Sequence, residues 1–165
     1  MLLDGSYAAV AVILADQQLV GYCGPVDGGV PSLAGHPFVN IQVAGPTYAT
    51  QGPGLPDGAT PAPLSAGQYA IANEGADDDQ IGSVRGTGGA ALVDVRDWGD
   101  GGGAAQSVAT AVSGTVTLTS VGSGYVAGTF NVVVAPPLAS GQLDSANATP
   151  LSGTFSAKTC PGALQ

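Results

Sequence analysis

Basic residues are scarce in this sequence, and the shortage excludes several kinds of partner. Lysine and arginine together number 3 in 165 residues, against 12 acidic residues, so the formal net charge is −9. Nucleic acids and anionic membrane surfaces are bound through dense Lys/Arg surfaces, which three residues cannot form. We therefore expect neither partner. Arg85, Arg96 and Lys158 are expected to be isolated surface charges or ion-pair partners of nearby aspartates.

Charged and aromatic residues are also few. The charged fraction is 9% and the aromatic fraction 5%, whereas globular proteins average about 25% charged residues. Such a composition, with 27 glycines, is typical of exported proteins, and it predicts a core of Val, Leu, Ile and Ala. The hydrophobic fraction of 44% excludes charge-driven disorder. The length predicts a single domain over residues 1–165.

The side chains that most enzymes need are nearly missing. His36 is the only histidine and the sequence contains no GxSxG motif, so a Ser-His-Asp site lacks its usual parts. A zinc site requires three or four nitrogen or sulfur ligands, which one histidine and two cysteines do not supply as a cluster. We therefore expect a protein that is not an enzyme.

The two cysteines, Cys23 and Cys160, are too far apart in the sequence for a redox CxxC pair. A disulfide between them is the favoured interpretation, because the composition indicates an oxidising compartment. Two buried free thiols are the alternative, since cysteine packs as a small hydrophobic residue.

No stretch of the sequence is long enough to cross a bilayer as a helix. The longest apolar run, residues 7–15, is shorter than the roughly 20 residues that a spanning helix needs. The first four residues lack the basic region of a signal peptide. We expect the mature or trimmed form of a secreted or cell-surface protein.

Period-two alternation predicts strands throughout the chain, and helical periodicity is almost absent. In residues 126–134, Val126, Gly128, Phe130, Val132 and Val134 share one face, and in residues 38–43 one face is apolar and the strand is expected to be half-buried. Proline and glycine dominate residues 44–66, which predicts an ordered loop or a mobile flap. The other expected strands are 7–15, 19–23, 68–72, 90–96, 115–119 and 151–160.

The order of these segments predicts an all-β fold. We expect a single antiparallel β-sandwich or a partly closed barrel of about eight strands, with the long Pro/Gly-rich loop inserted in its first half. A short echo of small residue, Gly, Thr and apolar residue recurs at residues 113–116, 127–130 and 152–155. It is too short to define a repeat protein.

The hairpin segments 114–119 and 128–130, the closing segment 151–157 and the early Cys23 resemble uncharacterised exported β-rich proteins and lipoproteins of myxobacteria. That family has no established activity or functional residues. The resemblance therefore implies only a location at the cell surface or outside the cell, for a secreted or lipoprotein-derived chain.

Aspartates are the only side chains numerous enough to form a metal site, and they form two clusters, one at residues 77–79 and one at Asp94, Asp97 and Asp100. Asp94, Asp97 and Asp100 lie in a glycine-rich stretch, and carboxylate oxygens there can bind Ca²⁺. A solvated acidic turn is the alternative. Trp98, in the same stretch, is either a core residue or an exposed stacking surface. If it is exposed, a glycan is the natural ligand, with Tyr48 and Tyr69 contributing further rings.

The sequence thus favours a non-enzymatic structural or adhesive domain that binds a protein partner or its own copies through sheet edges. A module that binds carbohydrate or another neutral ligand, with or without calcium, is the alternative. An ice-binding array at Thr115, Thr117 and Thr119 is a more remote member of that second class.

Overall fold

The computed structural model describes residues 9–15, 36–45, 64–72, 89–97, 106–122 and 124–158. These residues form seven strands and one short 3-10 turn, with no α-helix among them, so the all-β prediction is confirmed. The strands are β1 (Ala9–Ala15), β2 (Pro37–Ala44), β3 (Gly67–Ala70), β4 (Ala90–Asp97), β5 (Gln106–Gly122), β6 (Tyr125–Ala135) and β7 (Thr149–Lys158), and the turn is η4 (Ser145–Asn147).

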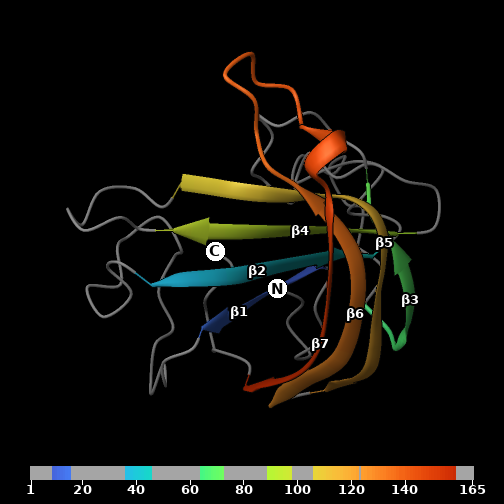
Figure 1. Ribbon diagram of the computed structural model, residues 1–165. Coiled ribbons are helices and arrows are strands. Elements are labelled where there is room, and N and C mark those ends of the chain that lie inside the picture. The colour runs from blue at the N-terminus through green and yellow to red at the C-terminus, as the bar shows by residue number, and fades with distance from the viewer. Residues whose placement is uncertain are drawn as a thin grey trace, which may run out of the picture.

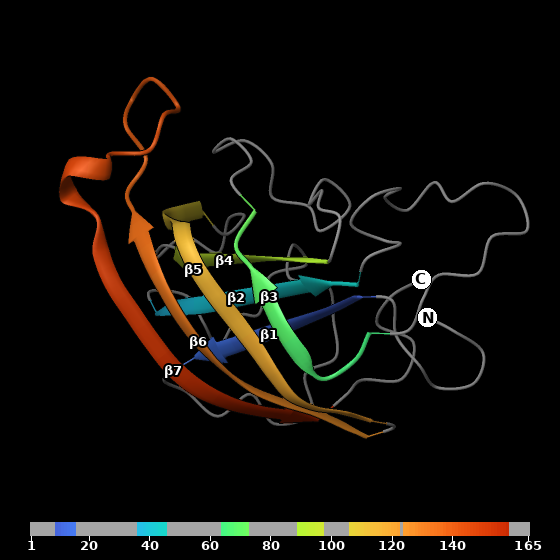
Figure 2. The same ribbon diagram turned by 90° about the vertical axis from the view of Figure 1, so that its right-hand side faces the viewer.

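All seven strands belong to one antiparallel sheet with the order β1-β2-β4-β5-β6-β7. The long strand β5 has two partners on one edge: its first residues pair with β4, and residues 115–118 pair with β3. Its other edge pairs with β6. The sheet curls into a half-barrel, so that β5, β6 and β7 cross in front of β1, β2 and β4 (Figures 1 and 2). Of the two predicted architectures, the structure is the partly closed barrel.

The curl is concentrated in β5, which shifts register three times. The shifts lie near Val95 in its pairing with β4, and near Val112 and Thr119 in its pairing with β6. Such bulges bend a strand and increase its twist. Gly114 lies beside the second shift with φ of +116°, and a Cβ there would approach the carbonyl oxygen of Asn131 to 2.3 Å. Only glycine fits this position, where β5 passes from β4 to β3.

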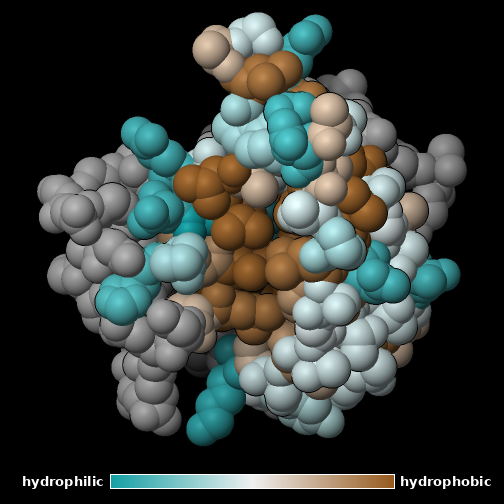
Figure 3. Space-filling model, viewed as in Figure 1, coloured by the Kyte–Doolittle hydropathy of each residue, from teal (hydrophilic) through white to brown (hydrophobic). Residues whose placement is uncertain are grey.

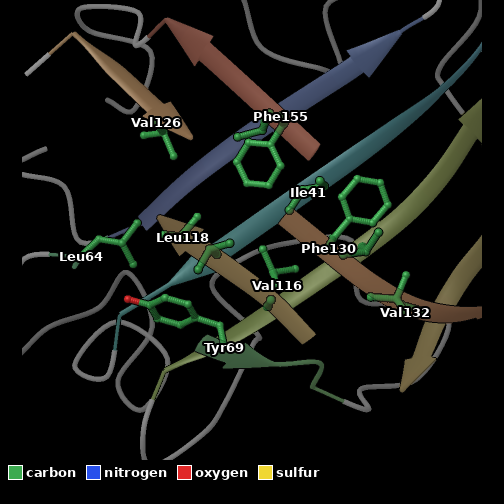
Figure 4. Packing of buried hydrophobic residues seen from close by; sticks show 14 of the residues in the cluster. Ile41, Leu64, Tyr69, Val116, Leu118, Val126, Phe130, Val132 and Phe155 are labelled. Carbon is green, nitrogen blue, oxygen red and sulfur yellow. The ribbon is translucent and has the colours of Figure 1, made fainter. Parts of the chain in front are cut away.

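The core lies between the two crossing layers. Ile41 comes from the rear layer, while Phe130 of β6, Phe155 of β7 and Leu118 of β5 come from the front layer (Figure 4). All four side chains are buried, and aliphatic residues and Tyr69 complete the cluster. The core is therefore made mainly of Val, Leu, Ile and Ala with two phenylalanines and one tyrosine, which agrees with the composition.

Alternation along the strands follows the predicted faces in β6 but not in β2. The five residues of β6 predicted to share a face are all buried, and Thr129 and Asn131 between them are exposed. In β2 the prediction of a half-buried strand is wrong. Ile41 and Val43 face the core, yet Asn40 and Phe38 on the opposite face are 1% and 2% exposed.

Two predicted elements lie wholly or mostly outside the described residues. The predicted return strand 19–23 is one of them; within the described residues, β1 pairs with β2. Most of the predicted loop 44–66 is the other. Its two ends are described: Ala44 is the last residue of β2, and Leu64 is buried in the core.

Replacing Gly114 with alanine tests its role in the curl. We expect Gly114→Ala to lower the free energy of unfolding by about 2–5 kcal/mol, because the Cβ adds a backbone clash to an unfavourable φ. Gly67→Ala is the matched control, since a Cβ at Gly67 meets nothing within 4 Å. Urea unfolding of both variants measures the difference. Equal stability of the two variants would contradict the conclusion that position 114 requires glycine.

Candidate functional site

The outer edge of β7 is the longest unpaired strand edge among the described residues. β7 is ten residues long and ends the strand order, with β6 paired along one side and no described strand along the other. Proteins usually protect such an edge with charges, proline or bulges. β7 has Pro150 near its start and Lys158 at its end, and the seven residues 151–157 carry neither charge nor proline.

Charge is distributed unevenly between the two parts of the chain. Residues 1–105 contain 11 acidic and 2 basic residues, which account for the whole net charge of −9. Residues 106–165 contain only Asp144 and Lys158 and are neutral overall. The strands β5, β6 and β7 therefore form an almost uncharged layer on an acidic protein.

The outward side chains of this layer form rows of hydroxyl and amide groups. Strand register places Thr117, Thr129 and Thr154 in one row, and a second row holds Thr115, Asn131 and Ser152. We call these six residues the hydroxyl face. Its β6 and β7 members are exposed, and its β5 members are half-buried. The amide of Gln68 in β3 extends it, with Nε2 donating to the hydroxyl of Thr115 at 3.4 Å.

The threonine row along β5 is not a flat array. Thr119 lies at a register shift, and its hydroxyl donates to the carbonyl of Ala127 at 3.2 Å. The strand also bends at Gly114. This geometry does not favour the ice-binding alternative, which requires a flat, regular surface.

The pairing of β6 with β7 brings two identical tripeptides together. Gly128-Thr129-Phe130 lies antiparallel to Gly153-Thr154-Phe155, so that threonine faces threonine and each glycine faces a phenylalanine. A Cβ at Gly128 would come within 2.8 Å of the Phe155 ring, and a Cβ at Gly153 within 2.8 Å of the Phe130 ring. Each phenylalanine thus packs over the glycine of the other strand. Two of the three copies of the echo seen in the sequence therefore form a self-complementary pair.

A second group of polar side chains is buried on the outer side of β2 and β4. It comprises Asn40, Gln42, Asp94, Arg96 and Thr110, none more than 9% exposed. Arg96 Nη2 lies 3.7 Å from Asp94 Oδ2. Arg96 is therefore an ion-pair partner of an aspartate, as predicted, but it is buried rather than on the surface. A buried pair of this kind fixes the local arrangement of the strands more than it adds stability.

The predicted calcium ligands are not brought together by the described strand. Asp94 and Asp97 lie in β4 at positions of opposite parity, and successive side chains of a strand point to opposite faces. Asp94 also has a cation, Arg96, beside it. Asp100 lies outside the described residues. The described residues contain no group of three or more His, Cys, Asp or Glu side chains able to hold a metal ion.

Tyr69, predicted as a ligand-binding ring, is instead part of the core. It is 5% exposed, and its hydroxyl donates to the carbonyl of Ser65 at 2.7 Å. Tyr125 is the exposed aromatic side chain that the sequence analysis missed, at 49%. Tyr125 directly follows the Gly122–Gly124 segment in the sequence, and a position next to such a predicted turn could have indicated that its ring is exposed. Tyr48, Trp98, Cys23 and Cys160 lie outside the described residues.

Comparison of the chain with family models, with curated proteins and with solved structures gives no match. Within the described part of the chain, no helix has the length and apolar character that crossing a membrane would require. The outer edge of β7 and the hydroxyl face beside it form the candidate site.

A double-mutant cycle tests whether Asp94 and Arg96 stabilise the fold through their interaction. We expect Arg96→Met alone to lower the free energy of unfolding by about 3–5 kcal/mol, because it removes the Arg96 cation from beside the buried Asp94 carboxylate. The double variant Asp94→Leu/Arg96→Met is expected to lose less than the sum of the single variants. Chemical unfolding of the four proteins measures the coupling. Additive losses would show that the two side chains do not interact.

Proposed function

We propose that this protein is a non-enzymatic, exported structural or adhesive β-domain, which acts at the cell surface through contacts with proteins, including its own copies. The observation that carries the proposal is the outer edge of β7, a ten-residue strand edge without a described partner in an almost uncharged layer. An extended segment from another protein can add to such an edge through main-chain hydrogen bonds.

Composition supports export. The exposed side chains of the hydroxyl face are uncharged, and the whole chain has 9% charged residues. A disulfide between Cys23 and Cys160, which remains a prediction, would fit an oxidising compartment. The resemblance to exported β-rich proteins supports the same location.

Self-association is the direct test of this proposal. Sedimentation of the purified protein from about 1 μM to about 1 mM is expected to show a mass that rises with concentration, because no described strand pairs with the outer edge of β7. Protein that stays monomeric over the whole range would contradict self-association. Non-reducing and reducing electrophoresis of the same samples separates strand pairing from intermolecular disulfides.

A neutral ligand on the hydroxyl face is the second candidate. The position of Tyr125 favours it, because Tyr125 lies on the outward side of β6, as do Thr129 and Asn131. The partner of Tyr125 in β7 is Lys158. An exposed aromatic ring on the same face of a sheet as hydroxyl and amide groups fits an extended polyhydroxylated ligand such as a neutral glycan.

The glycan candidate predicts a dependence on the Tyr125 ring. In calorimetric titrations with neutral oligosaccharides, we expect Tyr125→Ala to weaken binding by roughly tenfold or more, since aromatic anchors dominate such contacts. Tyr125→Phe, which keeps the ring, is the control. Absence of binding by the unaltered protein, or equal binding by both variants, would contradict a site at Tyr125.

A further inference from the structure

We propose that β7 pairs antiparallel with β7 of a second copy, about a two-fold axis at Thr154. This inference rests on the proposed function and specifies its partner and geometry. In this pairing Thr154 lies opposite Thr154 of the second copy, and Gly153 lies opposite Phe155 of the second copy. Both copies use the same surface, so the interface closes at a dimer.

The chain already brings the same residue types opposite one another internally, although there the Gly–Phe pairs face the ladder, whereas in the dimer the Thr–Thr pair does. Between β6 and β7, Thr129 is the partner of Thr154, and each Gly-Thr-Phe glycine is the partner of the opposite phenylalanine. The contacts are close, with a phenylalanine ring over each glycine Cα. β7 of one copy already has a Gly-Thr-Phe tripeptide opposite it, in β6. Because β7 carries the same tripeptide, β7 of a second copy would place a further Gly-Thr-Phe along the outer edge of the first β7.

Pro150 indicates which backbone groups face the free edge. Proline has no N–H to donate and is accommodated in an edge strand where the missing donor faces away from the ladder. In an antiparallel strand the backbone groups of alternate residues point to alternate edges. The N–H groups of Ser152, Thr154 and Ser156 are therefore expected on the outer edge. A two-fold axis at Thr154 pairs these three residues with one another and places Lys158 opposite Pro150.

This register keeps the two faces of the sheet continuous. Leu151 and Phe155, which point to the core side of β7, align with residues of the same side in the second copy. Figure 3 shows an apolar patch beside β7, over β2 and β4, and the added strand extends the sheet along it. On the opposite side, the row of Thr117, Thr129 and Thr154 continues into the same row of the second copy.

Charge favours a second copy at this edge over the other end of the sheet. The approach of two chains with a net charge of −9 is least opposed where residues are neutral, and residues 106–165 have no net charge. β1, at the other end of the strand order, is flanked in the sequence by Asp4 and Asp16. The β7 edge has a lysine at its end instead.

Paired charge substitutions at Thr154 test the two-fold axis. Thr154→Lys and Thr154→Glu each place like charges opposite each other across the axis, and each is expected to weaken the dimer by about tenfold or more. An equimolar mixture of the two variants is expected to regain the dimer as a mixed species. Sedimentation velocity of each variant and of the mixture measures this, with thermal unfolding to confirm that the variants fold.

Thr129→Lys and Thr129→Glu are the matched controls. Thr129 is an exposed threonine on the same face and in the same row, one strand further from the edge. Three strand spacings of about 4.8 Å would separate it from its copy across the axis, a distance of about 14 Å that exceeds the Debye length in physiological salt. Both Thr129 variants are expected to dimerise like the unaltered protein.

The outcomes separate this inference from the proposed function. Self-association that is unaffected by the Thr154 variants, or a mass that grows beyond a dimer, would overturn the two-fold pairing and leave self-association standing. Loss of association in both Thr154 variants without recovery in the mixture would also overturn it. A protein that stays monomeric would overturn both.

Discussion

The fold depends on the ability of one strand to change partner without breaking. β5 leaves β4 and continues against β3, and Gly114, at φ of +116°, marks the change. A side chain there would collide with the backbone of β6. The bend turns β5, β6 and β7 across the rear strands, which encloses the core between the layers. It also leaves β7 as the end of a curled sheet that does not close on itself among the described residues.

The described strands of the two layers hold their polar side chains in different ways. The buried pair of Arg96 and Asp94 lies on the outer side of β4, where polar side chains are enclosed. On the neutral layer, polar side chains are exposed instead and carry hydroxyl or amide groups. Such groups hydrogen-bond without the cost of removing a full charge from water. A surface of this kind suits contact with a neutral partner, with the β7 edge providing main-chain hydrogen bonds.

Strand positions and faces could be predicted where alternation was strong, as in β6, because a one-sided strand must alternate. The burial of Asn40 could not be predicted, because a period-two pattern does not show whether the second face of a strand is covered. The burial of Tyr69 could not be predicted either, because the small number of aromatic residues does not show which of them lie in the core. The Gly-Thr-Phe repeat was visible in the sequence, but its meaning depends on the β6–β7 register, a long-range property.

Hydrogen exchange of the β7 amides, resolved by residue and measured at several protein concentrations, tests whether this edge is free in the monomer and paired between copies. We expect the amides of Ser152, Thr154 and Ser156 to exchange rapidly in dilute protein and to become protected as concentration rises. The amides of Gly153 and Phe155, which face β6, are expected to be protected throughout. Equal protection of Ser152, Thr154 and Ser156 at every concentration would contradict a free β7 edge.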